Sequence, residues 1–430
     1  MDQSRVGNLT AQRQGFPRAA HETRLKILVL RVRLLYPLNT GGKIRSANLL
    51  EELSRENDLI LATYRYPEDT DDDVQRTARL CQRLVTVPYT ETPKRSARFF
   101  LELAANLFQP LPYVVAKYAS AEMAETVARL YAVEQPDLVL CDFLQSCPGL
   151  NSLRAVPFLL FEHNVEAALF EQLAQRAPHL LSRVYLRLQA RRLRRYERTQ
   201  CRRAHQVIAV SSEDRAAIAA EYGVAGCAVV PTGVDLKYFR PARTPCLANN
   251  LVFTGAMDWL ANQDAMRFFA AEIFPLIRAE VPDTVMSIVG RNPPAELLKL
   301  GEMHGMTVTG TVADIRPYVQ PAKVYVVPLR IGSGTRLKLL EAMAMGKAVV
   351  STTLGAEGLN VTPGRNIVLA DDPRAFARAV VILLRDAARR AELEQNARTL
   401  VERTCGWPQV GQVFEEICRH AAATLREESL

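Results

Sequence analysis

The stretch Gly332–Val350 (GSGTRLKLLEAMAMGKAVV) contains the residue types that best suit the binding of an anion. Ser333, Gly334 and Thr335 stand between an apolar run and a helical pattern that begins near Arg336. Small residues let backbone N–H groups approach a ligand, Thr335 can cap the helix, and a helix N-terminus favours negative charge. The pattern predicts that a phosphate or pyrophosphate binds at this turn.

Charged residues follow in the first turns of the same predicted helix. Arg336 and Lys338 add full positive charges at the end of the helix that already favours an anion. Glu341 follows, where its carboxylate can accept hydrogen bonds from sugar hydroxyls. On the pattern alone, the alternative is a well-capped helix with an Arg and a Lys on its surface.

A second group of polar residues ends an apolar run earlier in the chain. His163 closes the run FLLFEH and is followed by Asn164. A single histidine is more often structural, but at the carboxyl end of a strand it can contact a ligand. Glu162 and Glu166 flank it as weaker candidates for a general base.

Two loops after other predicted strands add candidates for ligand binding. Gly41 and Gly42 follow the first strand, where they form either a ligand-facing loop or a simple turn. Arg291 follows the run SIVG, from which it can reach the base or the phosphates of a nucleotide. We therefore expect the chemistry to lie where strands end.

The elements that must position these residues are strands alternating with helices, which predicts doubly wound parallel α/β sheets. Up to residue 235 the predicted strands lie in LKILVL, LILATY, LVTVP, PDLVLCDF, PFLLFEHN, QVIAVS and AVVPTGVD. From residue 251 they lie in LVFTGAM, TVMSIVG, MTVTG, KVYVVPL and AVVST. Ligands bind beyond the carboxyl ends of such strands, so two sheets predict an interdomain cleft.

The segment 236–250 (LKYFRPARTPCLANN) breaks this alternation and marks a domain boundary. We expect a flexible tail over 1–23, a Rossmann-like domain over 24–236, a second over 237–406, and a C-terminal helix over 407–430. Hydrophobic residues make up 48% of the 430 residues and charged residues 23%, which excludes a mostly disordered chain.

Several segments resemble, in order and spacing, the GT-B glycosyltransferases of family 4 (glycosyltransferases group 1), over roughly residues 25–420. They are FLLFEHNVEA, VIAVSSEDRAAI, VVPTGVDLKYFRP, LVFTGAMDWLANQDAMRFF, SIVGRNPP and the run from VTGTVADIRPYV to STTLGAEGL. The resemblance implies an N-terminal acceptor-side domain and a C-terminal domain that binds a nucleotide-diphospho-sugar. It also implies retention of anomeric configuration, with no bound metal and no other cofactor.

The resemblance implies roles for the candidate residues. His163 would contact the donor sugar or orient the acceptor hydroxyl, and the loop of Gly41 and Gly42 would face the donor phosphates. Glu341 corresponds to the second glutamate of the family's two-glutamate motif, which contacts the donor ribose. The first glutamate would fall at Ser333, so this chain lacks it.

A second departure concerns the phosphate-binding cations. Many family members carry an Arg and a Lys in the loop after the first strand of the second domain, and the corresponding loop here, GAMDWLANQD, has neither. We infer that Arg336 and Lys338 supply the missing charges, since fixed cations stabilise a leaving diphosphate.

The acidic cluster of Asp69, Asp71, Asp72 and Asp73 contains D-x-D spacing, which binds a divalent ion in metal-dependent glycosyltransferases. Here it opens a predicted helix, where acids stabilise the helix dipole, and we prefer that interpretation. No G-x-G-x-x-G or P-loop sequence occurs, which argues against NAD or ATP as a cofactor.

The net charge of +8 lies in the predicted helix Arg183–Arg203, which holds nine Arg and one Glu. One face carries Arg183, Arg187, Arg191, Arg194, Arg198 and Arg202. This face is either simply solvated or binds an anionic membrane surface. Nucleic acid is not expected as a partner, since no RNA-binding or zinc-finger pattern accompanies it. The apolar segment 94–118 is either an interfacial segment or a core helix with a basic end.

No apolar run is long enough to span a membrane, and no secretory leader is apparent. We therefore expect a cytoplasmic location, which becomes peripheral at the inner face of the cell membrane if the arginine-rich face binds lipid. The eight cysteines lack metal-binding spacing and are expected to be reduced residues, mostly in the core.

The sequence thus predicts an exopolysaccharide-type glycosyltransferase that moves a sugar to an acceptor hydroxyl on a lipid or a polysaccharide. Two alternatives stay open. One is a nucleotide-sugar epimerase of the same fold, which would need catalytic acids in the cleft. The other is a noncatalytic membrane- or nucleic-acid-binding protein, which the arginine-rich helix and the missing glutamate favour.

Overall fold

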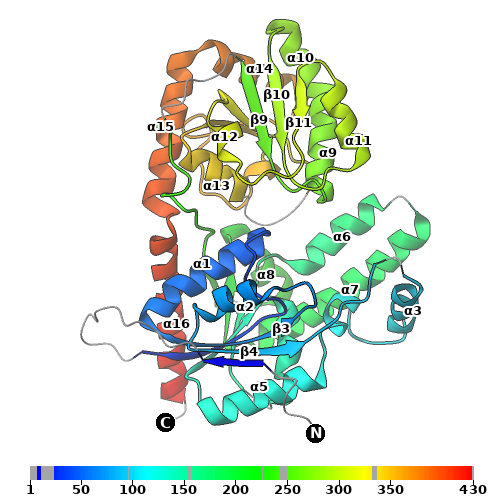
Figure 1. Cartoon of the computed structure of the whole chain (residues 1–430), viewed down its shortest axis with the longest axis vertical. Helices are drawn as coiled ribbons and strands as arrows, with labels where there is room; N and C mark the ends of the chain where they lie inside the picture. Colours follow the sequence, from blue (N-terminus) through cyan, green and yellow to red (C-terminus); the bar gives the residue numbers. More distant parts are fainter. Residues whose placement is uncertain are drawn as a thin grey trace. The chain divides into compact units, whose positions relative to one another are not determined.

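The computed structural model describes residues 7–10, 24–94, 96–153, 156–177, 179–224, 226–242, 249–331 and 337–428. These residues form two compact units, drawn in Figure 1. The first contains the chain up to Val230 and returns from Val410 onward, and the second is Pro231–Gln409. The domain limits expected at residues 236 and 406 stay predictions.

The first unit contains an eight-stranded sheet of order β1-β4-β3-β2-β5-β6-β7-β8. Its strands from β2 to β8 pair in parallel, as the alternating pattern predicts. They are β2 (Lys26–Leu30), β3 (Asp58–Arg65), β4 (Arg83–Pro88), β5 (Leu138–Asp142), β6 (Leu159–Phe161), β7 (Gln206–Ala209) and β8 (Cys227–Val229).

Strand β1 (Gly7–Thr10) pairs antiparallel with β4, which differs from the flexible tail expected over residues 1–23. The segment GNLT has neither the apolar run nor the alternation of a strand. It pairs because β4 would otherwise lie at the edge of the sheet with unpaired backbone groups.

Helices of the first unit begin where the sequence supplies hydroxyl caps. Thr40, Thr70, Ser96, Ser120 and Ser211 each accept a hydrogen bond from a backbone N–H in the first turn. The helices are α1 (Gly41–Glu56), α2 (Asp71–Ala78), α3 (Ala97–Asn106), α4 (Tyr113–Ala116), α5 (Ala121–Glu134), α6 (Glu166–Arg176), α7 (Leu180–Arg203) and α8 (Ser212–Tyr222), with a 3₁₀ segment over Leu144–Leu150. Figure 1 shows α1 and α2 on one face of the sheet and α5 on the other.

The C-terminal helix α16 (Trp407–Glu428) packs on the first unit from Val410 onward. Phe414 is 1% exposed, and its ring centroid lies 5.5 Å from that of Phe161 on β6. Near the end of the helix, Arg426 forms an ion pair of 2.6 Å with Asp137, just before β5. Helix α16 therefore completes the core of a unit whose other elements lie far away in the sequence.

The second unit contains a six-stranded parallel sheet of order β11-β10-β9-β12-β13-β14. Its strands are β9 (Asn250–Thr254), β10 (Val285–Val289), β11 (Met306–Val308), β12 (Val324–Val327), β13 (Ala348–Ser351) and β14 (Val368–Leu369). Its helices are α9 (Leu260–Phe268), α10 (Phe274–Glu280), α11 (Ala295–Leu298), α12 (Arg316–Val319), α13 (Leu337–Ala344), α14 (Pro373–Arg385) and α15 (Ala387–Thr404).

The cysteines pack as the sequence predicts. None of the seven cysteines in the described part of the chain forms a disulfide, and six of them are buried. Burial raises the pKa of Cys227 to about 11, so this thiol stays protonated and unreactive. Cys246 lies outside the described residues.

Candidate active site

Polar side chains of the first unit meet at the carboxyl ends of three neighbouring strands. Arg31 follows β2, Asp142 ends β5, and His163 stands two residues beyond β6. Asp142 forms a buried ion pair with Arg31 and lies 2.6 Å from Nε2 of His163. Because these strands are adjacent in the sheet, residues more than 100 positions apart share one cluster.

Both ring nitrogens of His163 have partners. Nε2 donates to Asp142 Oδ1, and Nδ1 accepts from Arg45 of α1 at 3.1 Å. Burial lowers the pKa of His163 well below its usual value, and the charges of Arg45 and Arg31 lower it further. The imidazole is therefore neutral and 2% exposed. Its expected contact with the donor sugar stays a prediction.

Gly42 has a packing role that Gly41 lacks. Phe143 stacks on His163 with ring centroids 3.6 Å apart. A Cβ atom on Gly42 would stand 2.6 Å from Cζ of Phe143, whereas one on Gly41 would meet nothing within 4 Å. Gly42 thus lets α1 approach the aromatic ring that supports His163. The expected contact of both glycines with donor phosphates stays a prediction.

The two arginines of this cluster are buried cations. Burial lowers the pKa of Arg31 to about 9 and that of Arg45 to about 10. Both side chains therefore stay charged at neutral pH, and both hold the ring or the carboxylate beside it. Arg31, Arg45 and Asp142 are not among the residues predicted from the sequence. Two of them could have been found, because Arg31 and Asp142 are charged residues at the carboxyl ends of predicted buried strands.

The carboxylates next to His163 are buried as well. Burial, followed by the charge of Glu197, raises the pKa of Glu162 well above its usual value, and burial also raises the pKa of Glu166. Glu197 of α7 accepts hydrogen bonds from the backbone N–H groups of Glu166 and Ala167 at 2.8 and 3.0 Å. It therefore holds the N-terminus of α6 and the loop that follows His163.

A cation lies at the carboxyl end of β9 in the second unit. Lys338 of α13 donates from Nζ to Asn262 Oδ1 at 2.7 Å and lies 4.0 Å from the ring centroid of Phe253. A Cβ atom on Gly255 would stand 2.7 Å from the same Nζ. The lysine thus reaches the loop GAMDWLANQD, which has no Arg or Lys of its own.

Two loops of the second unit approach each other through glycines. A Cβ atom on Gly290 would stand 1.7 Å from the carbonyl oxygen of Gly255, so only glycine allows this contact. The N–H of Met257 donates to the carbonyl of Arg291 at 2.8 Å. The Arg291 side chain is 31% exposed, with Nε 3.7 Å from Asp258. Arg291 therefore lies at the same strand edge as Lys338.

Glu341 follows Lys338 on α13 by three residues and is partly buried. Burial raises the pKa of Glu341 to about 7, against the charge of Lys338, which lowers it. The other candidates of this region, Ser333, Gly334, Thr335 and Arg336, lie outside the described residues. Of the predicted anion site, the structure thus places Lys338 and Glu341.

The acidic cluster near residue 70 opens a helix, which is the interpretation that the sequence favours over metal binding. Thr70 and Asp73 form a capping box at the start of α2, and Asp71 pairs with Arg65 at 2.6 Å. Within the described ranges, no three His, Cys, Asp or Glu side chains converge as metal ligands. No helix in the part of the chain that the structure describes is long and apolar enough to cross a bilayer.

Comparison with known families assigns both halves of the chain to one class of enzyme. Residues 40–238 match the family described as Glycosyltransferase Family 4, and residues 248–386 match Glycosyl transferases group 1. The fold and the family matches define a GT-B glycosyltransferase, which uses a nucleotide-sugar donor and an acceptor. The chain belongs to the family 4 (group 1) glycosyltransferases.

Curated relatives are distant in sequence. An uncharacterized 44.6 kDa protein in the cps region of Klebsiella pneumoniae is 22% identical and covers 88% of this chain and 95% of its own. A GDP-mannose-dependent monoacylated alpha-(1-6)-phosphatidylinositol monomannoside mannosyltransferase from Corynebacterium glutamicum is 27% identical. That match covers 44% of this chain and 55% of the relative.

Solved structures share the fold over nearly the whole chain. Sucrose-phosphate synthase from Thermosynechococcus elongatus has a TM-score of 0.69 at 20% identity, covering 93% of this chain and 100% of that one. Anabaena HepE, solved in complex with UDP and glucose, has a TM-score of 0.60 at 14% identity, covering 92% and 99%. At such identities these similarities establish the fold alone.

Proposed function

We propose that the protein transfers a sugar from a nucleotide-diphospho-sugar to a hydroxyl of a lipid-linked or polysaccharide acceptor, with retention and without a bound metal. The observation that carries the proposal is the position of Lys338. Its ammonium lies at the loop after β9, where many family members supply an Arg and a Lys. A fixed cation at this edge can stabilise the leaving diphosphate.

The other residues have complementary roles in this proposal. Arg336 adds a second cation to the diphosphate, with Ser333, Gly334 and Thr335 offering backbone N–H groups. Arg291 contacts the base or the phosphates. Glu341 accepts hydrogen bonds from the donor ribose, and these bonds are strongest when its carboxyl group is ionised.

His163 acts in the first unit. Asp142 and Arg45 fix the orientation of its ring, so it can position the donor sugar or the acceptor hydroxyl only by exchanging one of these partners. The neutral imidazole favours a positioning role over that of a general acid. Retention is supported by the family resemblance, and the cps-region relative supports a surface polysaccharide as the product.

A thermal-shift panel of UDP, GDP, ADP and their sugar conjugates tests the donor site, repeated with a chelator. We expect one nucleotide series to raise the melting temperature, because a ligand of the native state stabilises it by mass action. Lys338→Ala should remove the shift, whereas the control Lys299→Ala, an exposed lysine of the same unit, should keep it. An unchanged shift in Lys338→Ala, or a shift that the chelator abolishes, would contradict the proposal.

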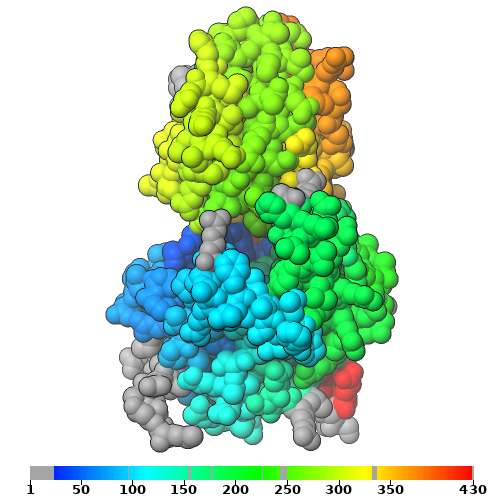
Figure 2. Space-filling view, turned by 90° about the vertical axis from the view of Figure 1, so that its right-hand side faces the viewer, coloured from blue at the N-terminus to red at the C-terminus, as the bar shows by residue number. Residues whose placement is uncertain are grey.

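A second observation favours an acceptor presented at a membrane. Large apolar side chains are exposed on α3, just after it and at the start of α7, and together they form an apolar patch: Phe100 57%, Leu101 70%, Phe108 91%, Leu180 72% and Leu181 85%. Arg192 of α7 donates to the carbonyls of Asn106 and Leu107, so the two elements adjoin. Figure 2 shows the surface near residue 100 in cyan beside the green surface of α7.

Six of the nine arginines of α7 fall into two groups. Arg194 pairs with Glu171 and Glu221, and Arg198 and Arg202 donate to backbone carbonyls at the end of α8. These three therefore stabilise the fold. Arg187, Arg191 and Arg195 are exposed and supply positive charge near the apolar patch, which suits anionic headgroups.

Flotation with vesicles tests the membrane surface. We expect binding to vesicles that contain phosphatidylglycerol and little binding to pure phosphatidylcholine. The double variant Phe108→Ser/Leu181→Ser should lose binding, and Val133→Ser, which is 69% exposed on α5, should retain it. Equal binding by both variants would contradict this assignment and leave a soluble polysaccharide acceptor.

A further inference from the structure

The carboxyl edge of the first sheet continues past the His163 cluster. In the sheet, β5 and β2 are followed by β3 and β4, and each strand ends at this edge. Arg31 after β2 belongs to the His163 cluster, and Arg33 two residues later lies 3.9 Å from the ring centroid of Tyr66. At a strand spacing of about 4.8 Å, the edge from β6 to β4 spans roughly 19 Å.

Four tyrosines gather at the ends of β3 and β4. The ring centroid of Tyr89 lies 4.9 Å from that of Tyr64, 5.1 Å from that of Tyr66 and 5.6 Å from that of Tyr118. The hydroxyls of Tyr64, Tyr66 and Tyr89 donate to backbone carbonyls. Tyr89 is partly exposed, whereas the other three are buried. This cluster therefore offers an aromatic ring held by rigid neighbours.

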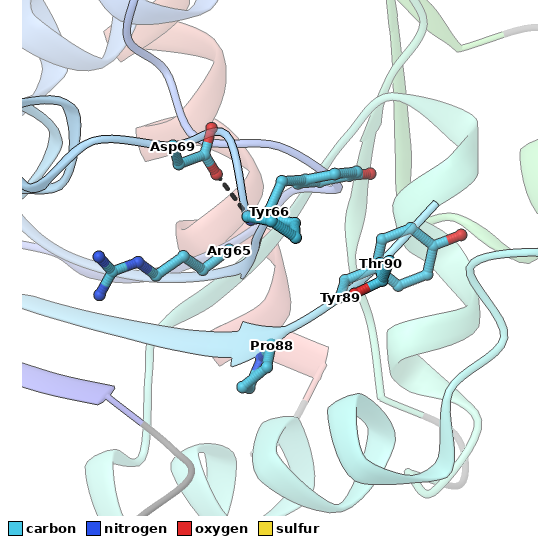
Figure 3. A pocket seen from close by; sticks show the side chains of 7 residues that line it. Arg65, Tyr66, Asp69, Pro88, Tyr89 and Thr90 are labelled. Carbon is cyan, nitrogen blue, oxygen red and sulfur yellow. Dashed lines mark hydrogen bonds between the residues drawn. The ribbon is translucent and has the colours of Figure 1, made fainter. Parts of the chain in front are cut away.

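Two cavities adjoin on either side of Tyr89 and Thr90. One, of about 290 Å³, is lined by Tyr66, Pro67 and Pro88 among others, and Figure 3 shows Tyr66 and Pro88 at the strand ends. The other, of about 320 Å³, extends toward α3 and α4. Tyr89 and Thr90 line both cavities, so the two lie next to each other, and we refer to the pair as the groove.

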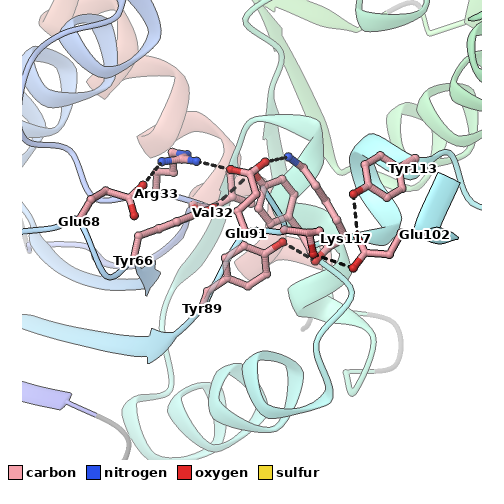
Figure 4. A network of polar contacts seen from close by, with 11 residues as sticks. Val32, Arg33, Tyr66, Glu68, Tyr89, Glu91, Glu102, Tyr113 and Lys117 are labelled. Atoms are coloured by element: carbon pink, nitrogen blue, oxygen red, sulfur yellow. Dashed lines mark hydrogen bonds and ion pairs between the residues drawn. The ribbon is translucent and has the colours of Figure 1, made fainter. Parts of the chain in front are cut away.

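The second cavity has fixed carboxylates in its wall, as Figure 4 shows. Glu91 is bound by Lys117 at 2.5 Å and by Arg33 at 2.6 Å. Burial alone would raise the pKa of Glu91, but the hydrogen bond and charge of Lys117, with Arg33, lower it. Glu102 accepts from Tyr113 at 2.9 Å. Ionised carboxylates with fixed orientation are acceptors for hydroxyl groups.

The composition of this groove selects a class of ligand. The described cations that line the two cavities already have carboxylate partners: Lys117 pairs with Glu91, Arg98 with Glu102 and Arg65 with Asp71. The groove therefore has little affinity to offer a phosphate. Its carboxylates make it unsuitable for an acyl chain. The groove presents aromatic and proline faces beside carboxylates that accept hydrogen bonds from hydroxyl groups. A sugar ring suits this surface, because it has apolar C–H faces and many O–H donors.

We propose that this groove binds sugar rings of the acceptor that lie away from the reacting hydroxyl, so that the acceptor is an oligosaccharide. The inference rests on the proposed function, since His163 at the other end of the same edge marks the reacting end. The length of the edge leaves room for more than one ring. The protein would then extend a chain that already carries several sugars.

Saturation-transfer NMR with neutral tetrasaccharides and their monosaccharides tests the groove. The probes are mannotetraose, cellotetraose, maltotetraose and chitotetraose. We expect at least one tetrasaccharide to bind more tightly than its monosaccharide. Tyr89→Leu should weaken that binding about fivefold to tenfold by removing the stacking face.

A double variant tests the groove independently, in case Tyr89→Leu does not fold. Arg98 and Gln109 line the second cavity and are exposed, so Arg98→Ala/Gln109→Ala should fold and still weaken the tetrasaccharide. Arg79→Ala/Gln82→Ala, two exposed residues elsewhere in the unit, is the matched control. Binding by no tetrasaccharide, or equal binding by wild type and double variant, would overturn the proposal. A nucleotide-induced thermal shift in the same samples shows whether the donor site survives independently.

Discussion

The cations beside His163 and the cation at the end of β9 have different kinds of partner. Arg31 is neutralised by Asp142, and Arg45 lies against a neutral imidazole, so both cations serve the packing around His163. Lys338 instead donates to the side-chain oxygen of Asn262 in α9 and lies beside Gly255 at the end of β9. This hydrogen bond orients the ammonium at the edge of the sheet where the proposed diphosphate would bind.

The raised pKa of Glu341 predicts a pH-dependent stability. Its pKa is about 7 in the folded protein against about 4.3 in an unfolded chain. The folded state therefore binds the proton more tightly, and the stability from this group is present below pH 4 and lost as pH rises through 7. Glu341→Gln should raise the free energy of unfolding at pH 8, on the order of 1 kcal/mol, and leave it nearly unchanged at pH 4.

Urea denaturation at the two pH values measures this difference. Glu296→Gln, an exposed glutamate of the same unit, is the control and should show no such pH dependence. Equal stabilisation by Glu341→Gln at both pH values would mean that ionisation of Glu341 is not the cause.

At the scale of elements, α7 has a role that its arginine pattern does not predict. It positions the loop that follows His163. Its Glu197 binds the N-terminus of α6, and Tyr222 of α8 donates to the same carboxylate at 2.7 Å. Three helices therefore meet at one buried acid. The charge pattern of the sequence draws attention to the nine arginines of α7. In the structure, Glu197 among them is the residue that connects α6, α7 and α8.

Replacing this acid should loosen α6. Glu197→Gln keeps the shape but turns an amide N–H toward backbone donors, which costs about 1–3 kcal/mol. Hydrogen–deuterium exchange should accelerate in the first turn of α6 at residues 166–169. Glu125→Gln, an exposed acid on α5, should change neither stability nor exchange. Unchanged exchange in Glu197→Gln would show that the amide oxygen holds the N-terminus of α6 as well as the carboxylate does, and would contradict this role of the acid.

For the whole molecule, most strands and the two-sheet organisation could be predicted, because parallel strands buried on both faces are visible as short apolar runs. Strand β1 and the two-residue β14 could not, since pairing with a neighbour rather than local sequence creates them. Likewise, strand ends predicted His163, but its partners Arg45 and Asp142 depend on which strands and helices become neighbours. The order of strands in the sheet is a tertiary property that no local pattern encodes.

The same reasoning applies to α16, whose amphipathic pattern predicts a helix but not its partner. Phe414 is 1% exposed against Phe161, so Phe414→Ala should lower the free energy of unfolding by about 3–5 kcal/mol. Val413→Ala, next to it and 38% exposed, should change it by less than about 0.5 kcal/mol. Because Phe161 immediately precedes the Glu162–His163 pair, Phe414→Ala should also increase hydrogen exchange around His163. A loss of stability with unchanged exchange there would place the role of α16 in the core alone.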